Sequence, residues 1–150
     1  MARFNKIYAG PVTEPTPQVQ ERICAAAILP GTALVESGAN FAQAGANTGE
    51  KFYIAQDNYL ALKGVDDAWP AGDTIIGMEA LDEQFFNVRV PTGTNVARGA
   101  KLTTNAAGKF VLATADQNVC VVAEEAFNNN TGSDQLVRAR VARRNTAVAA

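Results

Sequence analysis

The chain has 150 residues, of which 47 % are apolar and 19 % charged, and its net charge is −2. This length fits one domain that can bury a sizeable core, and so small a charge argues against a general nucleic-acid binder. No stretch approaches the roughly 20 apolar residues of a membrane-spanning helix, and Met1 to Gly10 lacks the apolar core of a secretory signal, so a cytoplasmic origin is expected.

Residues 1–18 are predicted to form an extended N-terminal arm. Pro11, Pro15 and Pro17 lie among polar residues, a composition that favours extended backbone over packed structure. Apolar side chains that can serve as anchors are spaced along the same segment, at Phe4, Ile7, Tyr8 and Val12. Such an arm docks either on its own barrel or on a neighbouring molecule, and the sequence leaves both possibilities open.

One turn phrase recurs along the chain, as Pro30-Gly31-Thr32, Pro70-Ala71-Gly72-Asp73 and Pro91-Thr92-Gly93-Thr94. Proline presets one turn dihedral, glycine supplies the permissive one, and the apolar residues that follow each copy suit a strand. The recurrence predicts an all-β fold, a compact β-barrel or sandwich with an extended N-terminal arm. The unequal spacing of the copies excludes a solenoid or a propeller.

Short strands are expected through most of the chain after the arm. Alternation favours a strand over a short helix for residues 18–29, and residues 59–62 fit either a strand or a turn of helix. The segment 37–49, rich in small residues, is predicted to be a mobile or surface-docked loop. Further strands are predicted at 33–35, 52–55, 74–76, 86–90, 101–103, 110–114, 119–123 and 136–141. These elements define an arm (1–18), a β-barrel domain (19–144) and a flexible C-terminal tail (145–150).

Alternation also predicts which side chains face the core in the strand at 86–90. Phe86, Val88 and Val90 share the inward face, whereas Asn87 and Arg89 are expected on the outward face.

Two charged clusters are candidate contact surfaces. Arg138 and Arg140 share the outward face of a predicted strand, and Arg143 and Arg144 follow them. This ridge can blunt an edge strand, clamp carboxylates of another subunit or bind nucleic acid, and the lack of interleaved aromatics argues against the last. The acidic residues between Lys63 and Arg89 have no spacing typical of a metal site, so we expect a solvated surface, with a subunit contact or a divalent-cation site as alternatives. They are Asp66, Asp67, Asp73, Glu79, Asp82 and Glu83.

Residues that enzymes commonly use are missing. The chain has no histidine, which removes the commonest general base and most transition-metal sites, and it has no phosphate-binding loop or nucleophile motif. We therefore expect neither catalysis nor a cofactor. Cys24 and Cys120 lie in apolar runs and are predicted to be buried free thiols, with a disulfide as the alternative. Trp69 is expected to cover one end of the barrel rather than to stack on a ligand.

The order of these motifs resembles that of the tailed-bacteriophage capsid decoration (cement) proteins of the small β-barrel type. The segments that carry the resemblance are 25–35, 71–74, 93–102, 108–113, 119–123 and the final Val-Arg-Ala-Arg-Val strand, which together span about residues 22–143. The resemblance implies a β-barrel that binds the outside of the expanded head of the virion and stabilises its lattice, often as a homo-oligomer, here a trimer or dimer. It implies synthesis in the host bacterial cytoplasm.

The expected partners are therefore the major capsid protein and further copies of this chain, and neither nucleic acid nor a membrane. The contact residues expected are Phe4, Ile7, Tyr8, Val12, Arg138, Arg140, Arg143 and Arg144. Two other functions stay open at this point: another virion β domain, associated with a tail, baseplate or fibre, and a carbohydrate-binding barrel.

Overall fold

The computed structural model describes residues 18–142, and nearly all of its regular structure is β, which confirms the predicted fold class. The expected contact residues Phe4, Ile7, Tyr8, Val12, Arg143 and Arg144 lie outside the described residues, as do most of the predicted arm and the predicted tail. Within the described range no helix is both long and apolar enough to cross a membrane.

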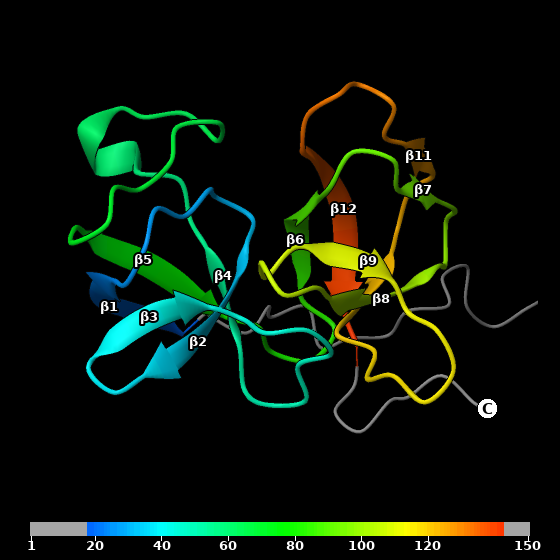
Figure 1. Cartoon of the computed structure of the whole chain (residues 1–150), viewed down its shortest axis with the longest axis horizontal. Helices are drawn as coiled ribbons and strands as arrows, with labels where there is room; N and C mark the ends of the chain where they lie inside the picture. The colour runs from blue at the N-terminus through cyan, green and yellow to red at the C-terminus, as the bar shows by residue number, and fades with distance from the viewer. Residues whose placement is uncertain (1–17, 143–150) are drawn as a thin grey trace, which may run out of the picture.

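The first half of the described chain forms a closed barrel with the strand order β1-β3-β2-β4-β5 (Figure 1). Neighbouring strands are antiparallel except for β1 and β3, which run parallel. A short 3₁₀ helix, η1 (Tyr59–Ala61), lies in the connection between β4 and β5, so the turn of helix was the right alternative for this segment. The barrel strands are β1 (Val19–Cys24), β2 (Ala33–Ser37), β3 (Asn40–Gln43), β4 (Tyr53–Ala55) and β5 (Thr74–Glu79).

The second half forms an antiparallel five-stranded sheet beside the barrel (Figure 1). Its strand order is β6-β12-β10-β8-β9. A two-stranded ribbon of β11 and β7 accompanies it. The strands of this second sheet are β6 (Phe85–Val90), β8 (Lys101–Thr104), β9 (Phe110–Leu112), β10 (Val121–Ala123) and β12 (Gln135–Val141), and those of the ribbon are β7 (Asn95–Val96) and β11 (Phe127–Asn128). The last strand of the described residues, β12, is therefore interior to the sheet.

The recurring turn phrase forms the same kind of turn in all three copies. Gly31, Gly72 and Gly93 have positive φ angles of 84°, 90° and 83°, the region that glycine alone adopts without strain. In each copy the residue after the glycine donates a backbone hydrogen bond across the turn, at 3.2–3.3 Å. A strand follows each turn, as predicted.

Within residues 18–142, two apolar clusters form the core and meet at the junction of the two halves. One lies inside the barrel and includes Phe41, Tyr53 and Trp69. The other lies under the second sheet but also takes in barrel residues, among them Phe52 and Ile54. The two halves therefore share buried surface instead of packing as separate bodies.

The structure describes three features that the sequence analysis singled out: the segment 37–49, the two cysteines and Trp69. The surface loop predicted for 37–49 is wrong, because β3 lies within it and Phe41 is fully buried. Cys24 and Cys120 are both buried and free, as predicted. Trp69 is buried in the barrel core, where its indole nitrogen donates to the carbonyl of Gln56 at 2.6 Å.

Candidate interaction surface

The predicted arginine ridge is only partly available for contacts with other molecules. β12 pairs with β6 on one side and with β10 on the other, so the interpretation as a blunted edge strand is wrong. Arg140 Nε lies 3.0 Å from Glu124 Oε1, and its Nη1 lies 4.0 Å from Glu83 Oε1. Arg138 is exposed, as predicted. Arg140 is thus largely neutralised within its own chain, and Arg138 is the member of the described pair that faces solvent.

The sequence did not single out the most apolar exposed feature of the described residues. This is the apolar loop, which we define as residues 57–67 between β4 and β5, and it contains η1. Its tip presents Tyr59, Leu60 and Leu62 with 57 %, 74 % and 94 % of their surfaces exposed. Adjacent large apolar side chains in such a position are typical of a surface that contacts another molecule.

Hydrogen bonds within the apolar loop fix how this tip is presented. The Asn58 side chain accepts from the Ala61 N–H at 3.2 Å, and the Asn58 carbonyl accepts from the Lys63 N–H at 3.0 Å. Leu62 has a φ of 56°, a left-handed conformation that costs a residue with a side chain about 1–2 kcal/mol. Because Leu62 is so exposed, burial within this chain does not offset that cost. The surrounding loop therefore holds Leu62 outward.

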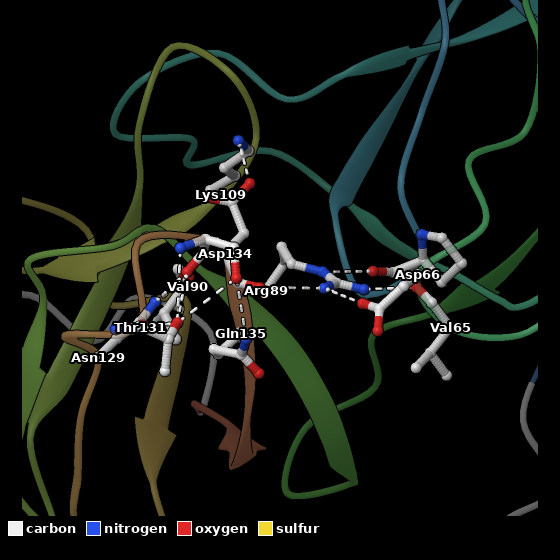
Figure 2. A network of polar contacts seen from close by, with 11 residues as sticks. Val65, Asp66, Arg89, Val90, Lys109, Asn129, Thr131, Asp134 and Gln135 are labelled. Carbon is white, nitrogen blue, oxygen red and sulfur yellow. Dashed lines mark hydrogen bonds and ion pairs between the residues drawn. The ribbon is translucent and has the colours of Figure 1, made fainter.

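A buried arginine anchors the base of the apolar loop (Figure 2). Arg89 of β6 is 1 % exposed, and its Nε donates to the carbonyl of Pro30 at 3.0 Å. Its Nη1 lies 2.9 Å from Asp66 Oδ1, and its Nη2 donates to the carbonyl of Val65 at 2.5 Å. The guanidinium thus joins the second sheet to the first barrel turn and to the apolar loop.

Sequence alternation had placed Arg89 on an outward face, and this prediction is wrong. Val88, Arg89 and Val90 are all buried, because the barrel covers the side of β6 that alternation assigns to solvent. The backbone confirms this contact, since the Arg89 N–H donates to the carbonyl of Gly31 at 2.8 Å. One feature of the sequence pointed to this pairing. The acidic residues that precede Arg89, which include its partner Asp66, are not interrupted by another lysine or arginine.

A second buried polar residue continues this network toward the end of β6. Asn129 is fully buried, and its side-chain amide donates to the carbonyls of Val90 and Ser133, at 3.2 and 2.9 Å. Its Oδ1 accepts from the Thr131 hydroxyl at 2.8 Å (Figure 2). This arrangement fixes the polar connection between β11 and β12, whose Asp134 forms an ion pair with Lys109.

The predicted acidic cluster is dispersed over the surface. Asp66 pairs with Arg89, and Glu79 Oε1 lies 3.4 Å from Lys51 Nζ. Among residues 18–142, no three potential metal ligands of the histidine, cysteine or carboxylate type come together.

A groove of about 790 Å³ separates part of the barrel from the second sheet. One wall comes from the barrel and includes Ile54 and Met78, and the other comes from β6 with Phe85 and Phe86. Val65 of the apolar loop also lines it. The structure therefore has two candidate surfaces for partners, the apolar loop and this groove.

No protein-family model and no curated protein matches this sequence. Among solved structures, the chain is similar to the head fiber gp8.5 N base of bacteriophage phi29, with a TM-score of 0.57 and 15 % sequence identity. The match covers 89 % of this chain and 100 % of that one. At this level of identity the likeness shows a shared fold.

Proposed function

We propose that this chain is a structural protein of a bacteriophage virion that binds the outside of the head and stabilises the capsid lattice. The observation that carries the proposal is the fold, which is shared over the full length of a domain described as the base of a head fiber. The order of the turn motifs, which resembles decoration proteins, is a separate argument from the sequence and supports the same role.

The apolar loop is the surface that we assign to attachment. Tyr59, Leu60 and Leu62 are held outward by a loop whose base is anchored on a buried arginine, so little backbone freedom is lost on docking. Burial of apolar surface contributes about 25 cal/mol per Å², so a contact of this size is individually modest. Many copies on one lattice would make the attachment multivalent, and oligomers of this chain would strengthen it further.

A fibre-associated role is the second candidate, and the same structural likeness favours it. The two roles differ in stoichiometry and in what the protein carries. A decoration protein is expected at a simple ratio to the major capsid protein, whereas the base of a fibre supports an additional component at fewer sites.

The first experiment is quantitative mass spectrometry of purified virions of the phage that encodes this chain. Hundreds of copies, near a simple ratio to the capsid protein, would support decoration. A few dozen copies or fewer would favour the fibre or another vertex or tail location. Absence from the particle would overturn both candidates and return attention to the carbohydrate-binding alternative.

A binding assay then tests the apolar loop. Purified protein is added to heads that lack it, and the variant Leu60→Ser/Leu62→Ser is compared with Leu112→Ser, which changes an exposed leucine on β9. The loop variant should bind at least about tenfold more weakly, because about 1.4 kcal/mol of lost apolar contact corresponds to that factor. The β9 variant should bind like the native protein. Equal binding by both variants would place the attachment surface elsewhere.

A further inference from the structure

The groove between the barrel and the second sheet combines polar and aromatic side chains. Gln56 and Asp57, directly after β4, line it on the barrel side, and Phe85, Phe86 and Asn87 line it on the side of β6. Its volume of about 790 Å³ lies within the range of about 300–1,000 Å³ that is typical of sites for small ligands. The groove therefore has the dimensions of a ligand site.

Three polar side chains of the groove have hydrogen-bonding capacity to spare. Within residues 18–142, the side chains of Gln56, Asp57 and Asn87 have no hydrogen bond or ion pair to another residue. The backbone on the barrel side is fixed, since the Gln56 N–H donates to the carbonyl of Ile76 at 2.9 Å and the Gln56 carbonyl accepts from Trp69 Nε1 at 2.6 Å. Two amides and one carboxylate thus supply both donors and acceptors to a ligand.

An aromatic ring stands at the rim of the groove. Phe85 is 62 % exposed, and Asn87 lies two residues further along β6. Their side chains point to the same face and are about 7 Å apart along the strand. Tyr53 and Trp69, by contrast, are buried in the barrel core and present no ring to a ligand. An exposed ring beside an amide suits a ligand that has an apolar face and a polar edge.

The charge of the groove narrows the ligand further. Among the described residues that line it there is no lysine or arginine, so a phosphate, sulfate or carboxylate would find no counter-ion. Arg138 lies beyond Asn87, in a smaller depression that shares residues 85–87 with the groove. A wholly apolar ligand is disfavoured as well, because it would remove water from the polar side chains without replacing their hydrogen bonds.

Neutral oligosaccharides have the chemistry that remains. A sugar ring carries hydroxyls around its edge, and each hydroxyl both donates and accepts hydrogen bonds. The C–H groups on one face of the ring carry a slight positive charge, which packs well on the negative face of an aromatic ring.

We propose that this groove binds a neutral oligosaccharide, with one sugar ring stacked on Phe85 and its hydroxyls hydrogen-bonded by Gln56, Asp57 and Asn87. Residues 59–62 at the tip of the apolar loop do not line the groove. The inference therefore goes beyond the attachment role proposed for that tip and does not depend on it.

Binding of labelled oligosaccharides to the purified full chain tests the proposal. The neutral probes are tetrasaccharides of glucose, mannose, galactose and N-acetylglucosamine, and the anionic probes are oligomers of glucuronic acid and of sialic acid. At least one neutral probe should bind saturably, with an affinity that does not fall as NaCl is raised from about 0.1 to 1 M, because no ion pair is involved. Binding of no neutral probe, or of the anionic probes alone, would overturn the proposal.

Substitutions locate the ligand in the groove. Phe85 and Asn87 are exposed, so Phe85→Ala and Asn87→Ala should keep the urea unfolding midpoint of the native protein. Phe85→Ala should weaken binding by about tenfold, and Asn87→Ala by about fivefold or more.

Leu112→Ala and Arg138→Ala are the matched controls, since both residues are exposed on the second sheet and neither lines the groove. Both controls should bind like the native protein. Unchanged binding by Phe85→Ala, or an equal loss in Arg138→Ala, would overturn the proposal.

Amide chemical shifts give a measurement that does not depend on variants. The bound neutral probe should shift the N–H resonances of residues 56–57 and 85–87 and leave those of residues 59–62 unchanged. Shifts confined to the tip of the apolar loop would overturn the assignment of the ligand to the groove.

Discussion

Arg89 is buried although its acidic partner is not. The Arg89 side chain is 2 % exposed, but that of Asp66 is 85 % exposed, so the carboxylate keeps most of its hydration. The remaining guanidinium donors reach backbone carbonyls of the first barrel turn and of the apolar loop. The geometry, with several donors in one plane, is one that arginine supplies and lysine does not.

Arg89→Lys should therefore destabilise the fold by about 2–4 kcal/mol, because a lysine ammonium leaves buried carbonyls without a donor. Urea unfolding of the two proteins measures the difference. The matched comparison is Asp66→Asn, which removes the carboxylate charge but keeps an oxygen acceptor for the guanidinium, so it should cost less than Arg89→Lys. Equal losses in both variants would mean that the ion pair, and not the carbonyl contacts, stabilises this region.

Cys24 gives the stability of the protein a dependence on alkaline pH. Burial, together with the nearby Asp73 carboxylate, raises the pKa of its thiol from 9.0 to about 11. As the pH rises through 9, the unfolded chain loses this proton first, so the free energy of unfolding falls between about pH 9 and pH 11. The Cys24 contribution to this fall is at most about 2–3 kcal/mol.

Cys24→Ala should flatten the corresponding part of the pH profile, measured by urea unfolding at pH 8 and pH 10.5. Burial also raises the pKa values of Cys120 and Tyr53, so some alkaline loss should persist in the variant. The difference between the pH profiles of the native protein and of Cys24→Ala gives the contribution of the Cys24 thiol. Identical slopes in the two profiles would contradict a raised pKa at this site.

At the scale of elements, the three proline–glycine turns were predicted from local chemistry because their requirements are local. Whether the glycine of a given turn tolerates a side chain depends instead on tertiary packing. A Cβ atom at Gly31 would lie 2.6 Å from Leu136 Cδ2 and 3.1 Å from the Asn87 carbonyl oxygen, whereas one at Gly72 or Gly93 would meet nothing within 4 Å.

Gly31→Ala should consequently lower the free energy of unfolding clearly more than Gly72→Ala or Gly93→Ala does. The latter two variants carry only the penalty of a positive φ, about 1–2 kcal/mol, because their φ angles are similar and their surroundings open. Gly31→Ala adds a collision with the second sheet, and we expect about 1–3 kcal/mol more. Thermal unfolding ranks the three, and equal midpoints would show that the barrel and the sheet separate easily at this turn.

Alternation predicted the existence of several strands but not always their buried face. In β1 the apolar Val19 and Ile23 are about half exposed, while Cys24 on the other face is buried in the barrel. In β3 the small residues around Phe41 have the composition of a loop, and only closure of the barrel shows that this aromatic ring is core. Both outcomes depend on distant strands, which local periodicity does not describe.

At the scale of the whole molecule, the barrel and the second sheet are expected to unfold together. Phe52 and Ile54 of the barrel belong to the cluster that underlies the second sheet, so either half alone would expose apolar surface. Trp69 lies in the other cluster, inside the barrel, and is the only tryptophan of the chain, which makes its fluorescence a probe of the barrel.

Leu102→Ala, a substitution in the second sheet, should therefore shift the unfolding transition seen by Trp69. Leu102 is fully buried, and its truncation typically costs about 2–5 kcal/mol. Lys101→Ala, at an exposed neighbouring position, should leave the transition within about 0.5 kcal/mol. An unchanged Trp69 transition in Leu102→Ala would mean that the two halves unfold independently.

The candidate site was less predictable than the fold. The arginine ridge was recognised from a simple pattern, yet β12 proved to be interior and Arg140 is paired within its own chain. The apolar loop was not found, because exposed and buried leucines look alike in a sequence of 47 % apolar residues. Its exposure follows from the way in which β4 and β5 close the barrel and exclude the connection between them.

The interior position of β12 has a consequence for how the protein is made. Ribosomes synthesise the strands of the barrel first, and β12 is the last strand of the second sheet to emerge, although it lies between β6 and β10. Until then β6 lacks its hydrogen-bonded neighbour in that sheet, and the cluster to which Phe52 and Ile54 belong lacks Val137, Ala139 and Val141 of β12. A nascent chain stalled just before residue 135 would therefore be a strong substrate for chaperones and proteases, and completion of β12 would end that vulnerability.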